Sequence, residues 1–112
     1  MKTPNENGVY KPDSVEEIAR CGRSYAAVRI CRCNDGLFRY SLDLMYSYGG
    51  FSGPITRENE GFTTFSAAKD AGMLEMLKRF PVAWASEPQS VHNELREVKT
   101  QIERNFSQPS LF

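Results

Sequence analysis

The sequence predicts an α+β domain in which helices cover an antiparallel sheet. Three observations favour this fold class: residues 25–48 hold two alternating runs joined by a short turn, residues 64–80 carry apolar side chains at helical spacing, and residues 91–106 repeat that spacing over a longer segment. The chain has 112 residues, 40% hydrophobic content and a formal net charge of zero. It is therefore long enough for one core, and no global field draws it toward nucleic acid or an anionic membrane.

The hairpin at Tyr25–Tyr48 is the centre of the predicted sheet, and the length of its loop decides its register. A two-residue turn at Asp35-Gly36 would mix core and solvent residues on each face. A three-residue loop at Asn34–Gly36, with Gly36 in the left-handed region, makes one face wholly apolar. It pairs Ile30 with Tyr40, Val28 with Leu42 and Ala26 with Leu44. We therefore predict the three-residue loop.

Shorter elements flank this hairpin. Ser14–Glu17 forms a capping box, which predicts a short N-terminal helix over residues 14–21. The buried side of that helix would consist of Val15, Ile18 and Ala19. After the hairpin, the glycine-rich segment Gly49–Pro54 predicts a bend or bulge, and Ile55–Arg57 predicts a short third strand.

Two longer helices complete the predicted domain. The first should begin near Thr64 or Ser66 and end before Pro81. Its apolar stripe, which would cover the sheet, consists of Ala68, Gly72, Met73, Met76, Leu77 and Phe80. The second follows a capping box at Ser86–Gln89 and has a narrow stripe of Val91, Leu95, Val98, Ile102 and Phe106. This narrow stripe either packs on the domain or pairs with its twin in a homodimer.

The organisation of the chain follows from these elements. We expect a flexible lead-in at residues 1–13, a single α+β domain at residues 14–106 and a free C-terminal tail at residues 107–112. No apolar run approaches the length of a membrane span, and the first residues lack the apolar region of a signal peptide. We therefore expect no membrane partner.

Neither the cysteines nor other reactive residues form a pattern typical of catalysis or metal binding. Cys21, Cys31 and Cys33 are odd in number, which favours free thiols in a reducing, cytoplasmic compartment. Cys31 and Cys33 share a strand face, but zinc sites need a second matching pair, and His92 alone is typical of a surface histidine. The sequence also lacks a nucleophile–base–acid set, a P-loop and a dinucleotide fingerprint. We expect no enzymatic activity, no cofactor and no metal.

The last five residues read Gln-Pro-Ser-Leu-Phe. They resemble the pentapeptide, glutamine then any residue then Ser or Asp then Leu-Phe, by which bacterial DNA polymerases, repair factors and mobile-element proteins bind the sliding clamp. The resemblance implies that Gln108 makes polar contacts, that Ser110 takes the small polar position, and that Leu111 and Phe112 fill a hydrophobic pocket. Pro109 departs from the motif, in which leucine is commonest there, but it pre-sets an extended chain.

This resemblance leads to the first function hypothesis. The protein would be a non-enzymatic accessory protein of bacterial DNA replication, repair or mobile-element maintenance, docked on the sliding clamp through residues 108–112. The alternative is that the same residues have a structural role. Leu111 and Phe112 would then fold back as a hydrophobic latch on the domain's own core.

A second hypothesis rests on an arginine and aromatic face of the sheet, made of Arg29, Arg32, Arg39 and Tyr48. Guanidinium groups pair with phosphates, and rings stack on bases, so this face suits a nucleic-acid-binding regulator. The alternative is an ordinary solvated sheet face.

Two loose resemblances bear on this second hypothesis. The helix–strands–helix order resembles a double-stranded-RNA-binding domain, although Phe65–Lys69 offers one lysine where that family has several. The turn at Asp35-Gly36 and the alanine-rich helix at Thr64–Leu77 resemble HicB-type antitoxins. A third hypothesis is a dimeric interaction module that uses the last helix.

Overall fold

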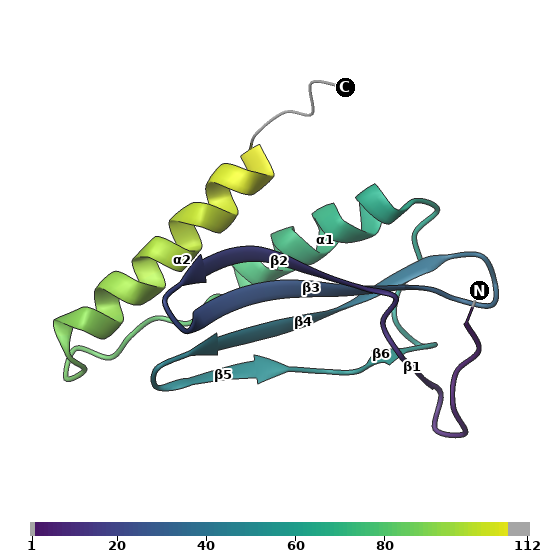
Figure 1. The fold of residues 1–112 in the computed structure, drawn as a ribbon, viewed down its shortest axis with the longest axis horizontal. Coiled ribbons are helices and arrows are strands. Elements are labelled where there is room, and N and C mark those ends of the chain that lie inside the picture. The colour runs from purple at the N-terminus through teal and green to yellow at the C-terminus, as the bar shows by residue number, and fades with distance from the viewer. Residues whose placement is uncertain (1, 108–112) are drawn as a thin grey trace.

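The computed structural model describes residues 2–107 and shows two helices packed against one face of an antiparallel sheet (Figure 1). The elements in chain order are β1 (Val9–Tyr10), β2 (Ser14–Cys21), β3 (Ser24–Arg32), β4 (Phe38–Tyr46), β5 (Gly49–Ser52), β6 (Ile55–Thr56), α1 (Phe65–Lys78) and α2 (Gln89–Ser107). Strands β2 to β5 form a four-stranded sheet in sequence order, and β1 pairs with β6 in a separate two-stranded sheet. The predicted α+β class is confirmed.

The central hairpin has the predicted register. Antiparallel pairing of β3 with β4 places Ile30 opposite Tyr40, Val28 opposite Leu42 and Ala26 opposite Leu44. The turn closes through a 2.8 Å hydrogen bond from the Cys33 amide to the Leu37 carbonyl, and Gly36 has a φ of 87°. A positive φ is accessible to glycine without strain, which is why the three-residue loop fits this sequence.

The predicted short helix at residues 14–21 is wrong, because these residues form the edge strand β2. The register with β3 shifts between Glu17 and Ala19, so the bulge turns both Ile18 and Ala19 inward. Two consecutive buried residues break the period of two that identifies a strand, and they imitate helical spacing. Val15, predicted as buried, is 58% exposed on the other face. The helix–strands–helix order that resembled a double-stranded-RNA-binding domain is therefore absent from residues 2–107.

The glycine-rich segment after the hairpin also differs from the expected bend, since Gly49–Ser52 pairs with β4 as the edge strand β5. At Gly50, with a φ of 153°, an added Cβ would lie 2.1 Å from the Leu44 carbonyl oxygen, so the strand itself requires glycine there. The short strand predicted at residues 55–57 is present as β6, and it pairs with β1. Strand β1 lies within residues 1–13, the segment predicted as a lead-in.

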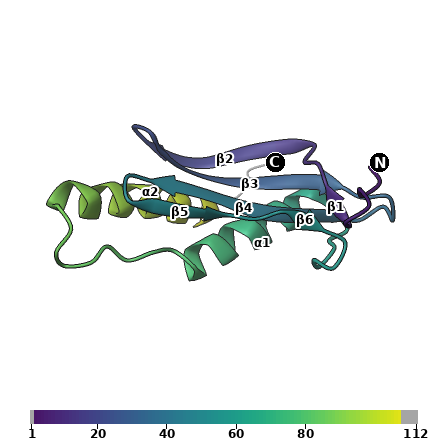
Figure 2. The same cartoon turned by 90° about the horizontal axis from the view of Figure 1, so that it is seen from below.

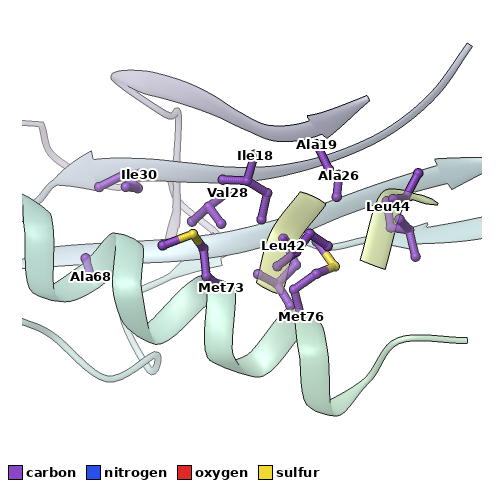
Figure 3. Packing of buried hydrophobic residues seen from close by; sticks show 12 residues of the cluster. Ile18, Ala19, Ala26, Val28, Ile30, Leu42, Leu44, Ala68, Met73 and Met76 are labelled. Carbon is purple, nitrogen blue, oxygen red and sulfur yellow. The ribbon is translucent and has the colours of Figure 1, made fainter. Parts of the chain in front are cut away.

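The main core lies between the four-stranded sheet and the two helices (Figure 3). Its buried members are Ile18, Ala19, Ala26, Val28, Ile30, Leu42, Leu44, Ala68, Met73, Met76, Val98 and Ile102. A smaller cluster of Tyr10, Cys31, Cys33 and Ile55 is buried where β1 and β6 cover the other face of β3. The main sheet is thus covered by helices on one face and partly covered by a two-stranded sheet on the other.

Candidate functional site

Four of the five residues of the α2 apolar stripe pack inside the molecule; the helix follows α1 after a long connection (Figure 2) and lies mainly against β2. Val91, Leu95, Val98 and Ile102 are at most 4% exposed, whereas Phe106 at the end of the stripe is 40% exposed. The stripe is therefore occupied by the sheet and by α1, and a homodimer built on it would require α2 to leave its own domain.

Polar side chains on α2 also hold the outer edge of β2. The Gln101 amide nitrogen donates to the Arg20 carbonyl at 2.9 Å, and its Oε1 accepts from the Arg20 amide at 2.8 Å. One turn later, Asn105 Nδ2 donates to the Ile18 carbonyl at 3.4 Å. These bonds fix the last turns of α2 against the sheet. The clamp-like residues Gln108, Ser110, Leu111 and Phe112 follow the last residue of α2 and lie outside the described residues.

The arginine face of the second hypothesis is divided among different local structures. Arg39 is 8% exposed, and its guanidinium forms paired bonds of 3.0 and 2.9 Å to the Asp35 carboxylate. Its Nε donates to the Asn59 carbonyl at 2.9 Å. The side-chain hydrogen bond to Asp35 raises the pKa of Arg39, and the same bond lowers the pKa of Asp35. Arg39 therefore joins the β3–β4 turn to the loop after β6.

Arg32 and Tyr48 lie at opposite ends of the hairpin. Arg32 is the last residue of β3 beside the turn, where its guanidinium lies 5.8 Å from the centroid of the Phe38 ring. Tyr48 is 56% exposed in the turn between β4 and β5. The structure thus does not gather Arg29, Arg32, Arg39 and Tyr48 into one surface.

Arg29 lies directly opposite Ser41 across the β3–β4 pair, on the face away from the helices. Its Nη2 donates to the Gly53 carbonyl at 2.5 Å, so the guanidinium is fixed against the connection between β5 and β6. Neither Arg29 Nε nor Ser41 Oγ, both buried, has a hydrogen-bond partner within the described structure. Such atoms are rare in folded proteins and call for a physical explanation.

Both residues line a pocket of about 400 Å³, the Arg29 pocket, which is formed by Val9–Pro12, Arg29, Ser41 and Ser52–Ile55. An adjoining pocket of about 280 Å³, the Glu75 pocket, shares Ser41 and residues 52–54 with it and extends toward α1. The two lie beside β4 where β5 stops, because β5 pairs with Asp43–Tyr46 alone. Volumes of this size accommodate small molecules.

The Glu75 pocket is lined by a chain of paired polar groups. Tyr40 Oη donates to Glu75 Oε1 at 2.5 Å, and Arg79 Nη1 donates to Glu75 Oε2 at 3.0 Å. Burial and the bond to Glu75 raise the pKa of Tyr40. Arg79 also lies 4.5 Å from the centroid of the Phe51 ring. The tyrosine, the glutamate and the arginine of the Glu75 pocket are thus already paired with one another.

Glu94, which sequence reasoning missed, joins the start of α2 to two turns of the sheet. Its carboxylate accepts from the Ser24 hydroxyl, from the Ser47 amide at 2.9 Å and from the Ser47 hydroxyl at 2.7 Å. Burial acts to raise the pKa of Glu94, but these hydrogen bonds outweigh it and leave the pKa below its usual value. No sequence signal relates Glu94 to serines 70 and 47 residues away.

The three cysteines are free thiols, Cys21 half-buried and Cys31 and Cys33 fully buried. Burial, followed by the nearby Asp13 carboxylate, raises the pKa of Cys31 to about 12. Between residues 2 and 107, no three His, Cys, Asp or Glu side chains are arranged to hold a metal ion. Neither described helix is both long and apolar enough to cross a membrane.

Comparisons with known proteins return no relative. No protein-family model, curated protein or solved structure matches this chain.

Proposed function

We propose that this protein is a non-enzymatic accessory protein of bacterial DNA replication, repair or mobile-element maintenance that docks on the sliding clamp through residues 108–112. The observation that carries the proposal is the sequence Gln-Pro-Ser-Leu-Phe, which follows directly after the last residue of α2. Its glutamine, serine, leucine and phenylalanine match the clamp-binding pentapeptide at each of the four defined positions.

The chemistry of these residues supports docking in a pocket. Burying a leucine or phenylalanine side chain contributes about 1.5–3 kcal/mol, so Leu111 and Phe112 together supply most of the attraction in so short a peptide. Pro109 restricts the backbone between the polar and apolar positions, which lowers the entropic cost of ordering the peptide on binding.

The role of the domain follows from tethering. Once residues 108–112 occupy a clamp site, the domain is held at high effective concentration near the clamp and the DNA that it encircles. Occupancy alone would also exclude other proteins that use the same clamp pocket. Because α2 is fixed to the sheet through Gln101 and Asn105, the body would be held close to its docking peptide.

The proposal is tested by calorimetric titration of the intact protein into a purified bacterial sliding clamp. We expect a Kd on the order of 1 μM, equivalent to about 8 kcal/mol. The Leu111→Ala/Phe112→Ala variant should lose detectable binding, because about 3–6 kcal/mol of apolar burial is removed. Pro109→Leu, which restores the commonest residue of the motif, should bind more tightly than the wild type.

Phe106→Ala is the matched control, because it removes a phenylalanine that is 40% exposed just before the motif. It should bind the clamp as the wild type does. Thermal melting of the Leu111→Ala/Phe112→Ala variant separates docking from the latch alternative. Docking predicts an unchanged Tm, whereas a latch predicts a lower one. Failure of the folded wild type to bind, or equal binding by the double variant, would refute the proposal.

A further inference from the structure

We propose that the Arg29 pocket binds a small organic molecule through one oxyanion, a phosphate or a carboxylate, held by Arg29 Nε and Ser41 Oγ. This site is built from described residues alone, and it does not depend on clamp docking. Two buried polar atoms, Arg29 Nε and Ser41 Oγ, have no partner among residues 2–107, and both belong to residues that line this pocket.

The backbone places these two groups together. Arg29 and Ser41 are directly opposed in the β3–β4 register, so their side chains leave the same face with Cβ atoms about 5 Å apart. Ser41 is 7% exposed, and its hydroxyl group has no hydrogen-bond partner among the described residues. Nη2 of Arg29 is already bonded to the Gly53 carbonyl, and this contact holds the guanidinium in place while Nε remains available as a donor.

The charge of the lining specifies an anion. The Arg29 pocket includes the cations Arg29 and Lys11, and no aspartate or glutamate is among its lining residues, all of which the structure describes. Asp43, two residues from Ser41 on the same face of β4, accepts a hydrogen bond from Tyr25 and does not line the pocket. A guanidinium N–H beside hydroxyl groups is an arrangement that suits an oxyanion, because a charged acceptor strengthens each hydrogen bond.

The rest of the lining indicates that the anion is part of a larger molecule. The pocket volume of about 400 Å³ exceeds what a lone phosphate fills, and Val9, Pro12 and Pro54 supply apolar surface. Ser52 adds a second hydroxyl group to the lining. A ligand with one charged end and a small apolar or ring-shaped body would match these features.

The test is an NMR titration of the full-length, ¹⁵N-labelled protein with inorganic phosphate, acetate and phenyl phosphate, each at constant ionic strength with chloride as the reference anion. We expect saturable shifts of the Arg29 Nε–H signal and of the Ser41 and Ser52 amides. Tighter binding of phosphate than of acetate would assign the oxyanion as phosphate, and the reverse order as carboxylate. Phenyl phosphate should bind more tightly than inorganic phosphate because its ring reaches the apolar wall.

Variants locate the binding. Ser41→Ala removes one hydroxyl group, and Arg29→Gln removes the charge; each should weaken binding about tenfold or more, as expected for a lost hydrogen bond to a charged group. Arg23→Gln is the matched control, because it removes the same charge from an exposed residue in the β2–β3 turn and should leave affinity unchanged. Equal shifts with chloride, equal weakening in Arg23→Gln, or wild-type affinity in Ser41→Ala would each overturn the proposal.

Discussion

Gly72 illustrates how a single residue fixes the distance between a helix and the sheet. A Cβ built at this position would lie 2.6 Å from Val28 Cγ1 and 3.3 Å from Tyr40 Cδ1. Val28 is fully buried and β-branched, so its side chain has little freedom to move aside. The glycine that weakens α1 in isolation therefore allows α1 to approach β3 and β4 closely, as its place in the apolar stripe predicts.

We expect Gly72→Ala to destabilise the protein. Better helix propensity contributes about 1 kcal/mol, but overpacking against Val28 costs about 1–3 kcal/mol. The net loss should appear as a lower midpoint in urea unfolding. Gly53→Ala is the control, since nothing lies within 4 Å of its added Cβ, and its midpoint should stay near that of the wild type. A stabilised Gly72→Ala variant would show that the helix moves outward at no cost.

Glu94 has an effect on stability that depends on pH. Its pKa is lowered in the folded state, so its contribution is complete above the unfolded-state pKa and is lost as pH falls through the folded-state value. We expect Glu94→Gln to lose about 1–3 kcal/mol at pH 7, because an amide cannot accept all the bonds from Ser24 and Ser47.

Urea unfolding of Glu94→Gln from pH 7 to pH 3 measures this effect. The difference from the wild type should shrink as the pH falls through the folded-state pKa of Glu94, which lies below its usual value, because the carboxylate then becomes protonated. Glu103→Gln changes an exposed carboxylate on the same helix and serves as the control. If the difference between Glu94→Gln and the wild type were the same at every pH, the charge of Glu94 would not be its source.

At the scale of elements, side chains of α2 protect part of the outer edge of β2. An edge strand presents unpaired amides and carbonyls that can recruit another chain. Here Gln101 pairs with both the amide and the carbonyl of Arg20, and Asn105 pairs with the carbonyl of Ile18. The side chains of a helix thus take the position of a neighbouring strand along part of the edge.

Gln101→Ala should open this edge. We expect the free energy of unfolding to fall by about 0.5–1.5 kcal/mol, which is the net contribution of a typical hydrogen bond to stability, because water partly replaces the lost bond. Hydrogen exchange at the Arg20 amide should accelerate, and self-association should rise with protein concentration in sedimentation. Lys99→Ala changes an exposed residue on the same helix and should alter neither property. An unchanged exchange rate at Arg20 would mean that Gln101 does not protect β2.

The same elements show what local sequence can and cannot predict. The β3–β4 hairpin was predictable because one turn of three residues sets the register and the alternation of apolar residues checks it. The β2 strand could not be predicted in this way, because a bulge at Ile18 interrupts the alternation of buried and exposed residues that identifies a strand. The pairing of β1 with β6 joins Tyr10 to Ile55, and no local pattern encodes a contact between segments so distant in the chain.

The candidate sites, too, could be predicted from the sequence only in part. Sequence alternation correctly placed Arg29 and Arg39 on the face of the hairpin away from its apolar side. It could not show that Asp35 and Asn59 hold Arg39, or that Gly53 holds one nitrogen of Arg29. Those partners lie in turns and loops whose positions depend on the folded chain. The clamp-like pentapeptide, in contrast, is a purely sequence-level prediction.

At the scale of the whole molecule, two cores of unequal size share the central strand β3. The main core has twelve buried residues beneath two helices, whereas the cluster under β1 and β6 has four. Each strand of the small sheet is two residues long. Local opening requires less free energy where few apolar contacts must be broken. The small sheet should therefore open while the main core remains folded.

Cys31 and Cys33 report this opening, because both are fully buried in the small cluster and Cys21 lies elsewhere on β2. In the closed state the pKa of Cys31, raised to about 12 chiefly by burial, leaves little reactive thiolate near pH 8. Opening exposes the thiol and restores an ordinary pKa of about 8.5. Labelling with a thiol reagent, followed by mass spectrometry, should therefore modify Cys21 first and the buried pair at a rate set by opening.

Ile55→Ala should accelerate labelling of Cys31 and Cys33 by about 30-fold or more, since removing a buried isoleucine side chain costs about 2–5 kcal/mol. Hydrogen exchange in α1 should remain at its wild-type rate, because Ile55 belongs to the small cluster. Met76→Ala, in the main core, should lower global stability with little effect on labelling in the absence of denaturant. If Cys31 and Cys33 reacted only in step with global unfolding, the two cores would form one cooperative unit and β1–β6 would not open independently.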